Sequence, residues 1–170
     1  ATKPFIGGIL GITVDQGFIK SEKDKLLPYF NSRYAEIANL DKRKKEITIE
    51  NFLTYRHGID CENNNPESKG NEQSMMQSKD WEPNQASLNT FSQMYFTPRD
   101  LIKLAKLFKD GGKWKGNQII SKSWIDKTFN MDKGDYGYLW EHKYFVVDGQ
   151  TYNSYLASGN GGQKINIWPE

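Results

Sequence analysis

The sequence is poor in the residues that form covalent cross-links and metal sites, since it has one cysteine, Cys61, and two histidines among 170 residues. A single cysteine excludes a disulfide within the chain, and two histidines without a Cys/His cluster do not favour a structural zinc site. His57 lies four residues before Cys61, but residues 58–60 between them are typical of a loop, which does not favour a Cys/His nucleophile. The sequence therefore implies no metal and no organic cofactor.

Strong charge of one sign and long hydrophobic runs are also missing. The net charge of +2 is too small to indicate a nucleic-acid partner, and the basic run at residues 41–46 is flanked by acidic residues, as in a solvated turn. The longest apolar stretch, around residues 5–14, is too short to span a membrane. The length of 170 residues suits one modest domain with a hydrophobic core.

Residues 4–14 are apolar on nearly every side, which predicts a buried helix near the start of the chain. Gly7, Gly8 and Gly11 lower the intrinsic stability of this helix, which indicates close packing against a neighbour. Gly17 is placed to end it.

Four later helices are predicted from N-cap side chains, namely Ser21 (to Pro28), Thr48 (within residues 47–54), Thr97 and Ser121 or Ser123. The helix after Thr97 has the clearest signal, because Pro98 stands at its first position and Asp100 at its third, and Gly111-Gly112 can stop it. Residues 61–80 contain almost no apolar side chains and predict a long surface loop.

The last part of the sequence predicts antiparallel strands at residues 136–140, 144–147, 151–155 and 165–168. Asp148-Gly149 is a good hairpin turn between two of them. Helices first and a strand meander last predict an α+β fold with helices packed on one antiparallel sheet. We expect the hairpin aromatics (Tyr136, Tyr138, Trp140, Tyr144, Phe145) to form core contacts and cross-strand pairs rather than a ligand cage.

A glycine-rich stretch, residues 157–163 (ASGNGGQ), comes just before the last strand. Glycines there allow a backbone N–H to approach a ligand closely, although a plain hairpin turn explains the stretch equally well. The chain opens on Ala1-Thr2-Lys3 and an apolar helix, so a serine directly before Ala1 would complete an S-x-x-K motif at a helix start.

These blocks together resemble the β-lactamase-related serine hydrolases, which include class C β-lactamases, D-Ala-D-Ala peptidases and esterases. Residues 1–19 resemble the S-x-x-K helix, and residues 47–60 (ITIENFLTYRHGID) resemble the block ITI-x-x-LLT-x-x-SGL. Residues 96–101, 111–114 and 136–140 resemble later helix and strand blocks, and residues 159–163 (GNGGQ) stand where the family has K-T-G, H-G-G or N-G-G. The order matches over nearly the whole chain.

The sequence departs from this family in three places. The nucleophilic serine would lie just before Ala1 and is not among these residues. The helical middle region with its Tyr-x-Asn or Tyr-x-Ser element should fall between Asp60 and Phe96, and the sequence there does not contain it. The C-terminal strand and helix of the family have no counterpart. We therefore expect residues 1–170 to be a single, partial β-lactamase-like domain, with a segment missing at residues 80–82, near Trp81.

The resemblance implies a role for each candidate residue. Lys3 would be the base that activates the serine, together with a tyrosine whose position we cannot assign; without the resemblance, Lys3 is an ordinary surface lysine. The N–H groups of that serine and of Gln163 would hold the oxyanion. Asn160 would replace the family's lysine, which fits an ester or small amide at least as well as a β-lactam or peptide, and Gly161 and Gly162 would keep the strand edge open to substrate.

Two other interpretations remain open. A relative that keeps the fold but lacks the nucleophile would be a binding or scaffold protein, and a small adhesion or carbohydrate-binding domain would rest on the hairpin aromatics alone. Arg56 and His57 follow a helix, so we expect them to cap it rather than to act in catalysis. Members of the family are often exported or periplasmic.

Overall fold

The computed structural model describes residues 2–30, 40–58, 65, 67, 96–130, 134–159 and 162–169. The chain divides into two compact units, Ala1–His57 with Phe96–Glu170 and Gly58–Tyr95. All the helices and strands below belong to the first unit. The predictions for Cys61, for most of the 61–80 loop and for the missing segment at residues 80–82 lie outside the described residues.

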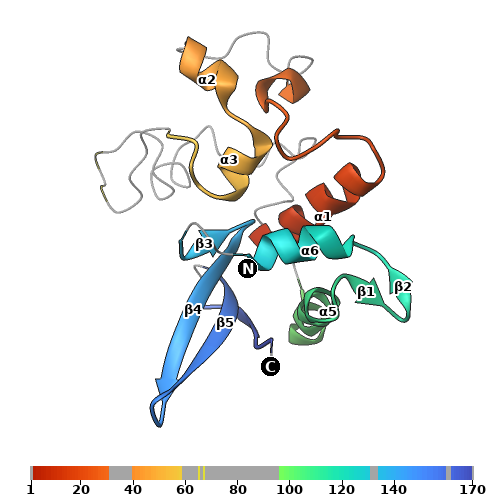
Figure 1. Cartoon of the computed structure of the whole chain (residues 1–170), viewed down its shortest axis with the longest axis vertical. Helices are drawn as coiled ribbons and strands as arrows, with labels where there is room; N and C mark the ends of the chain where they lie inside the picture. Colours follow the sequence, from red (N-terminus) through yellow and green to blue (C-terminus); the bar gives the residue numbers. More distant parts are fainter. Residues whose placement is uncertain are drawn as a thin grey trace. The chain divides into compact units, whose positions relative to one another are not determined.

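The helical elements are α1 (Lys3–Asp15), the 3-10 helix η1 (Leu27–Phe30), α2 (Lys42–Glu46), α3 (Ile49–Leu53), α5 (Pro98–Lys109) and α6 (Lys122–Phe129) (Figure 1). Three predicted N-caps are confirmed, because the side chains of Thr48, Thr97 and Ser121 each accept a hydrogen bond from a backbone N–H in the first turn. Gly17 has a positive φ of 76° directly after α1, as expected of the residue that ends a helix.

Two predictions between α1 and α3 were wrong. No α-helix follows Ser21, whose hydroxyl oxygen instead accepts from the N–H of Lys23 in a turn, and Pro28 lies inside η1 rather than ending a helix. The basic run at residues 41–46, predicted as a solvated turn, instead contains the short helix α2. The Asp41 carboxylate caps this helix by accepting from the N–H of Lys44.

A four-stranded antiparallel sheet has the order β3-β4-β5-β6, formed by β3 (Tyr136–Gly137), β4 (Trp140–Val147), β5 (Gln150–Ser158) and β6 (Lys164–Ile167). The predicted turn between β4 and β5 is confirmed, since both Asp148 and Gly149 have positive φ, as a type I′ hairpin requires. A second, two-stranded sheet of β1 (Lys113–Trp114) and β2 (Asn117–Gln118) was not predicted.

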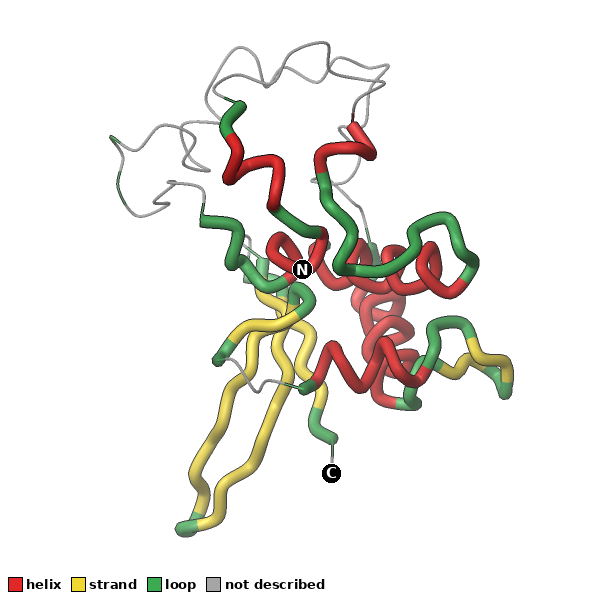
Figure 2. Tube along the Cα trace, turned by 45° about the horizontal axis from the view of Figure 1, so that its top comes forward, coloured by secondary structure: helices red, strands yellow, loops and turns green. Residues whose placement is uncertain are grey.

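The predicted α+β organisation is confirmed, and one core joins the helices to the sheet. Helix α5 contacts β6, and the outer part of the β4–β5 hairpin extends away from the helices (Figure 2). The fully buried apolar side chains come from α3, α5, α6, the segment before α6 and the sheet: Ile49, Leu53, Leu104, Phe108, Ile120, Trp124, Ile125, Tyr138, Trp140, Ala157, Ile165 and Ile167. Of the hairpin aromatics, Trp140 and Tyr138 are core residues as expected, whereas Tyr144 and Phe145 are exposed.

Helix α1 packs through its glycines, as the sequence predicts. A Cβ on Gly11 would lie 2.6 Å from Cδ1 of Trp124, and one on Gly7 would lie 2.9 Å from the carbonyl oxygen of Tyr138. The indole Nε1–H of Trp124 donates to the carbonyl of Gly7 at 3.0 Å. The expectation of burial on all sides was wrong, because the opposite face carries Ile9, which is 46% exposed.

Candidate functional site

Lys3 is the first residue of α1, and its exposed side chain reaches an aromatic ring in the turn that follows α3. Its Nζ lies 5.2 Å from the ring centroid of Tyr55, in a cation–π arrangement. Tyr55 follows α3 with a φ of 54°, a left-handed conformation that few non-glycine residues adopt. This reversal of the chain after α3 sets the direction in which the Tyr55 ring leaves the backbone.

A second tyrosine extends this contact into the sheet. The rings of Tyr55 and Tyr136 meet edge to face, with centroids 4.8 Å apart and planes at 84°. Burial, together with the neighbouring Tyr55 hydroxyl, raises the pKa of Tyr136 far above its ordinary value. Lys3, Tyr55 and Tyr136 form a row from α1 through the end of α3 to β3, which we call the Lys3 cluster.

The described residues of the glycine-rich stretch that lie between β5 and β6 are Gly159, Gly162 and Gln163, and backbone hydrogen bonds join them. The N–H of Gly162 donates to the carbonyl of Gly159 at 2.9 Å, and the N–H of Gly159 donates to the carbonyl of Gln163 at 3.0 Å. Gly162 has a φ of 82°, which explains why a glycine stands there. Asn160 and Gly161 lie outside the described residues, and Gln163 is exposed at the start of β6.

The start of α1 lies near the end of the sheet that carries this turn. Both views show α1 beginning beside the end where β4 starts and β5 finishes (Figures 1 and 2). The close approach of Gly7 to the Tyr138 carbonyl, between β3 and β4, holds α1 there. Among the described residues, no hydrogen bond, ion pair or ring contact joins Lys3 to Gly162 or Gln163, so the structure brings Lys3 together with tyrosines rather than with the glycine turn.

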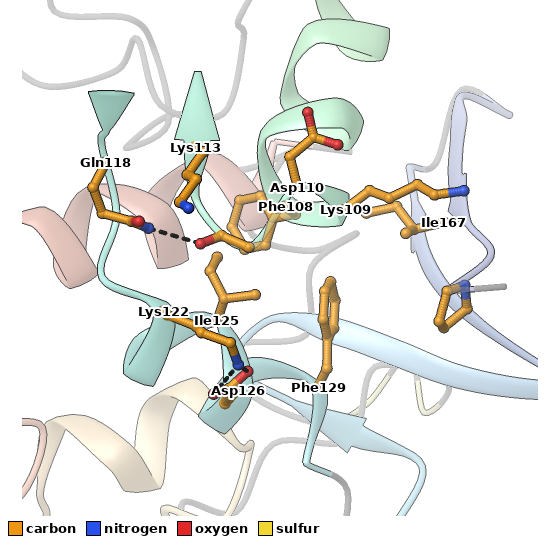
Figure 3. A pocket seen from close by; sticks show the side chains of 12 residues that line it. Phe108, Lys109, Asp110, Lys113, Gln118, Lys122, Ile125, Asp126, Phe129 and Ile167 are labelled. Atoms are coloured by element: carbon orange, nitrogen blue, oxygen red, sulfur yellow. Dashed lines mark hydrogen bonds and ion pairs between the residues drawn. The ribbon is translucent and has the colours of Figure 1, made fainter. Parts of the chain in front are cut away.

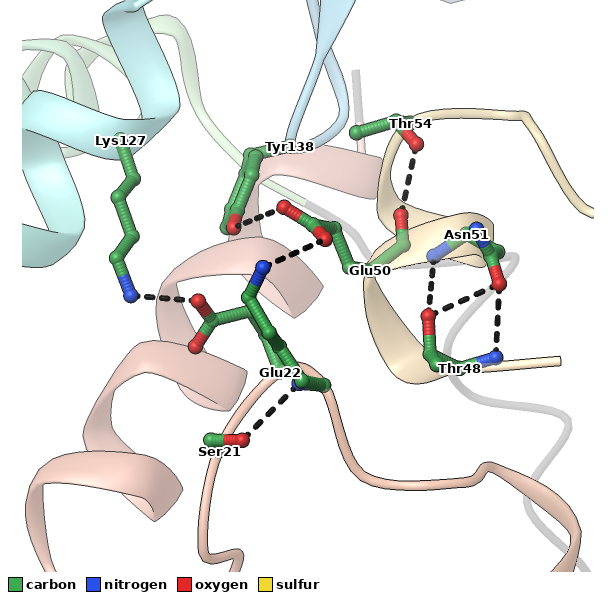
Figure 4. Close-up of polar contacts among 9 residues, drawn as sticks. Ser21, Glu22, Thr48, Glu50, Asn51, Thr54, Lys127 and Tyr138 are labelled. Atoms are coloured by element: carbon green, nitrogen blue, oxygen red, sulfur yellow. Dashed lines mark hydrogen bonds and ion pairs between the residues drawn. The ribbon is translucent and has the colours of Figure 1, made fainter. Parts of the chain in front are cut away.

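Beside the Lys3 cluster lies a cavity of about 240 Å³ with charged walls, which we call the charged cavity. Its lining includes Glu22, Glu50, Arg56, Lys127, Tyr136 and Tyr138. Figure 4 shows Lys127 reaching Glu22, with Nζ and Oε1 2.6 Å apart, and the Tyr138 hydroxyl pointing to Glu50. Loop, α3, α6 and β3 residues thus supply one polar wall.

Glu22 is the most buried acidic side chain of this wall, with 4% of the residue exposed. Burial alone would raise the pKa of its carboxyl, but the hydrogen bond from Lys127, a backbone hydrogen bond and nearby lysines lower the pKa below its ordinary value. Burial and the charges of Glu22 and Glu50 raise the pKa of the Tyr138 hydroxyl, which keeps it a hydrogen-bond donor.

A larger cavity of about 420 Å³ lies between α5, α6 and the end of β6. Its floor is apolar, formed by Phe108, Ile125, Phe129 and Ile167, and lysines stand at its rim (Figure 3). None of the candidate residues predicted from the sequence lines it. The volume of a cavity therefore does not identify the candidate site in this protein.

Arg56 ends α3 through its backbone, because its N–H donates to the carbonyl of Asn51 at 2.7 Å. Its side chain lines the charged cavity instead. The ring of His57 lies 4.7 Å from that of Phe52, which again places this segment against α3. The predicted end-of-helix role thus holds for the backbone of Arg56.

No local pattern in the sequence indicates that Tyr55, Tyr136 or Glu22 belongs to a site. Tyr55 depends on a left-handed backbone conformation, and Glu22 on an ion pair with a residue 105 positions later, so neither pairing has a local pattern. No group of three metal-ligating side chains occurs within the described parts of the chain. No helix among those parts is long and apolar enough to cross a membrane.

Comparison of the chain with protein-family models and with curated protein sequences finds no match.

Proposed function

We propose that this chain belongs to a serine hydrolase with a β-lactamase-like fold, which cleaves an ester or amide through an acyl-enzyme. The nucleophile is a serine directly before Ala1, and Lys3 is the base. The observation that carries the proposal is the position of Lys3, in the first turn of a glycine-packed helix that begins beside the end of the sheet where β4 starts and β5 finishes.

The local geometry of α1 suits an S-x-x-K motif. Thr2 has right-handed helical dihedral angles, φ −73° and ψ −32°, and the N–H of Phe5 donates to its carbonyl at 3.0 Å. A serine three positions before Lys3 on a helix faces the same side, one turn away. A lysine at that distance can accept the serine proton during attack.

In the proposed reaction the serine oxygen bonds to the substrate carbonyl carbon while its proton passes to Lys3. The carbonyl becomes an oxyanion held by two N–H groups, those of the serine and of Gln163. Collapse breaks the bond to the alcohol or amine, which leaves with the proton, and water then releases the acid from the acyl-enzyme. Gln163 is suited to this role because the N–H of Gly159 donates to its carbonyl at 3.0 Å, which restrains its backbone.

The test uses the full-length natural protein that contains these residues and a fluorophosphonate probe, which labels activated serines. After digestion with trypsin, we expect the label on the serine that precedes Ala1, in the peptide that continues through Lys3-Pro4. Lys3→Ala should lower the labelling rate by about a hundredfold or more, because general base catalysis contributes about that much. Lys20→Ala, in the loop after α1, is the control and should label at the natural rate.

A full-length protein without a serine at that position, or one whose label lies elsewhere, would contradict the proposal. The chain would then fit the rival interpretation, a binding or scaffold protein that keeps the fold without its nucleophile.

A further inference from the structure

The charged cavity contains two opposite charges whose partners within the chain leave them incompletely satisfied. Several opposite charges elsewhere on the surface are paired directly, as Lys122 is with Asp126 on α6 at 2.7 Å. One of the two groups is a carboxylate, Glu50, and the other is a guanidinium, Arg56.

Glu50 has contacts that are too long for a saturated carboxylate. The Tyr138 hydroxyl lies 3.4 Å from its Oε1, and Nζ of Lys23 lies 3.8 Å from its Oε2. Charge-assisted hydrogen bonds are normally about 2.5–2.9 Å long. The side chain of Lys23 is largely exposed, so a ligand ammonium can approach Glu50 without displacing a buried partner.

Glu22, by contrast, needs no ligand. Lys127 donates to its carboxylate at 2.6 Å, and the side chain is almost fully buried. The pair therefore forms a fixed, neutral part of the wall, beside Glu50 in the polar network of Figure 4.

Arg56 is the complementary group. None of the ion pairs among the described residues involves it, although it lines the same cavity as Glu50. Its Nη2 lies 3.5 Å from the position of a Cβ on Gly134, so the guanidinium lies directly beside that glycine on the cavity wall. A guanidinium offers five N–H donors in a fork that matches a carboxylate.

We propose that the charged cavity binds a small zwitterion, a molecule with an ammonium group that bonds to Glu50 and a carboxylate that bonds to Arg56. Its volume of about 240 Å³ accommodates a molecule of amino-acid size. The site does not depend on the hydrolase proposed above, because none of its residues is the serine, Lys3 or Gln163.

The test is calorimetric titration of the chain with 4-aminobutanoate, next to butylamine and butanoate, which each carry only one of the two charged groups. We expect saturable binding of 4-aminobutanoate, and about tenfold or more weaker binding of each single-ended compound, since one charge-assisted hydrogen bond contributes that much. The homologues with three and six carbons, 3-aminopropanoate and 6-aminohexanoate, then show which distance between ammonium and carboxylate fits Glu50 and Arg56 best.

Two variants test which residue binds the ammonium end of the ligand and which binds the carboxylate end. Glu50→Gln should abolish the advantage of 4-aminobutanoate over butanoate, and Arg56→Gln its advantage over butylamine. Glu46→Gln and Arg43→Gln, exposed residues of α2, are matched controls that change the same charges away from the cavity and should bind normally. Binding of none of the homologues to the natural chain, equal binding of all three kinds of compound, or binding unchanged in both cavity variants would overturn the proposal.

Discussion

At the scale of single residues, Gly11 shows most directly how α1 is fixed. A Cβ at this position would lie 2.6 Å from Cδ1 of Trp124, a ring that is buried and hydrogen-bonded to the Gly7 carbonyl. Gly11→Ala should therefore lower the free energy of unfolding by about 1–3 kcal/mol, although alanine favours a helix.

Gly8→Ala is the control, because its Cβ would meet the flexible tip of Ile120 at 3.2 Å, and we expect a smaller loss. Urea unfolding of both variants measures which of them loses more free energy of unfolding. Equal stability of the Gly11 variant and the natural chain would show that α1 does not pack on Trp124.

The pair of Glu22 and Lys127 should make stability depend on pH. Because the pKa of Glu22 is lowered in the folded chain, its contribution is present above the ordinary value of 4.5 and is lost as pH falls through the lowered pKa. Lys127→Met leaves a buried carboxylate without its partner and should lower stability at neutral pH by about 1–3 kcal/mol.

The difference between the natural chain and this variant should shrink as pH falls from 4.5 through the lowered pKa, where Glu22 of the folded natural chain becomes protonated. Thermal unfolding from pH 7 to about pH 3 measures it. Lys122→Met, on the same helix and paired with the exposed Asp126, should change stability little at any pH. A constant difference over this range would assign the loss to the packing of the lysine stem.

At the scale of elements, α5 owes its first turn to a reciprocal cap. The Thr97 hydroxyl oxygen accepts from the N–H of Asp100, and the Asp100 carboxylate accepts from the N–H and the hydroxyl of Thr97. Hydrogen bonds from Lys103 and Thr97 lower the pKa of Asp100 to about 2. Thr97→Ala should cost about 1 kcal/mol of stability, whereas Thr151→Ala, exposed in β5, should cost less.

Calorimetric unfolding of Thr97→Ala, Asp100→Ala and the double variant tests the cap. We expect the double variant to lose less than the sum of the single losses, because the hydrogen bond from the Thr97 hydroxyl to the Asp100 carboxylate is lost in either single variant. Additive losses would mean that the two side chains act separately.

The comparison of sequence and structure also belongs to this scale. Helix α5 could be predicted with its first residue, since Thr97, Pro98 and Asp100 act within one turn. The absence of a helix after Ser21 could not be predicted, because that segment pairs with the residues just before α3. Lys25 forms a β-bridge with Thr48, and the N–H of Leu26 donates to the carbonyl of Ile47. The Lys3 cluster and the charged cavity escaped prediction for the same reason, as they join residues that are distant along the chain.

At the scale of the whole molecule, the first unit is built from both ends of the chain. Among the described residues, hydrogen bonds cross between its two segments: Trp124 donates to Gly7, Ser121 to Asp15, Lys127 to Glu22, Tyr138 to Glu50 and Leu139 to Leu53. The core likewise combines Ile49 and Leu53 with residues of α5, α6 and the sheet. Neither segment can bury its apolar side chains alone, so we expect each to depend on the other for folding.

Cutting the chain between these segments tests that dependence. A specific protease site inserted next to Asn65, which is exposed, allows cleavage after folding. We expect the two fragments to elute together in size-exclusion chromatography and to separate only in denaturant, because a shared core holds them without a covalent link.

Leu53→Ala, which removes a nearly fully buried side chain, should weaken this association by about 2–5 kcal/mol. Phe52→Ala, the exposed neighbour in α3, should leave it nearly unchanged. Fragments that separate in buffer alone, with each keeping its helices or strands, would mean that the two segments fold independently.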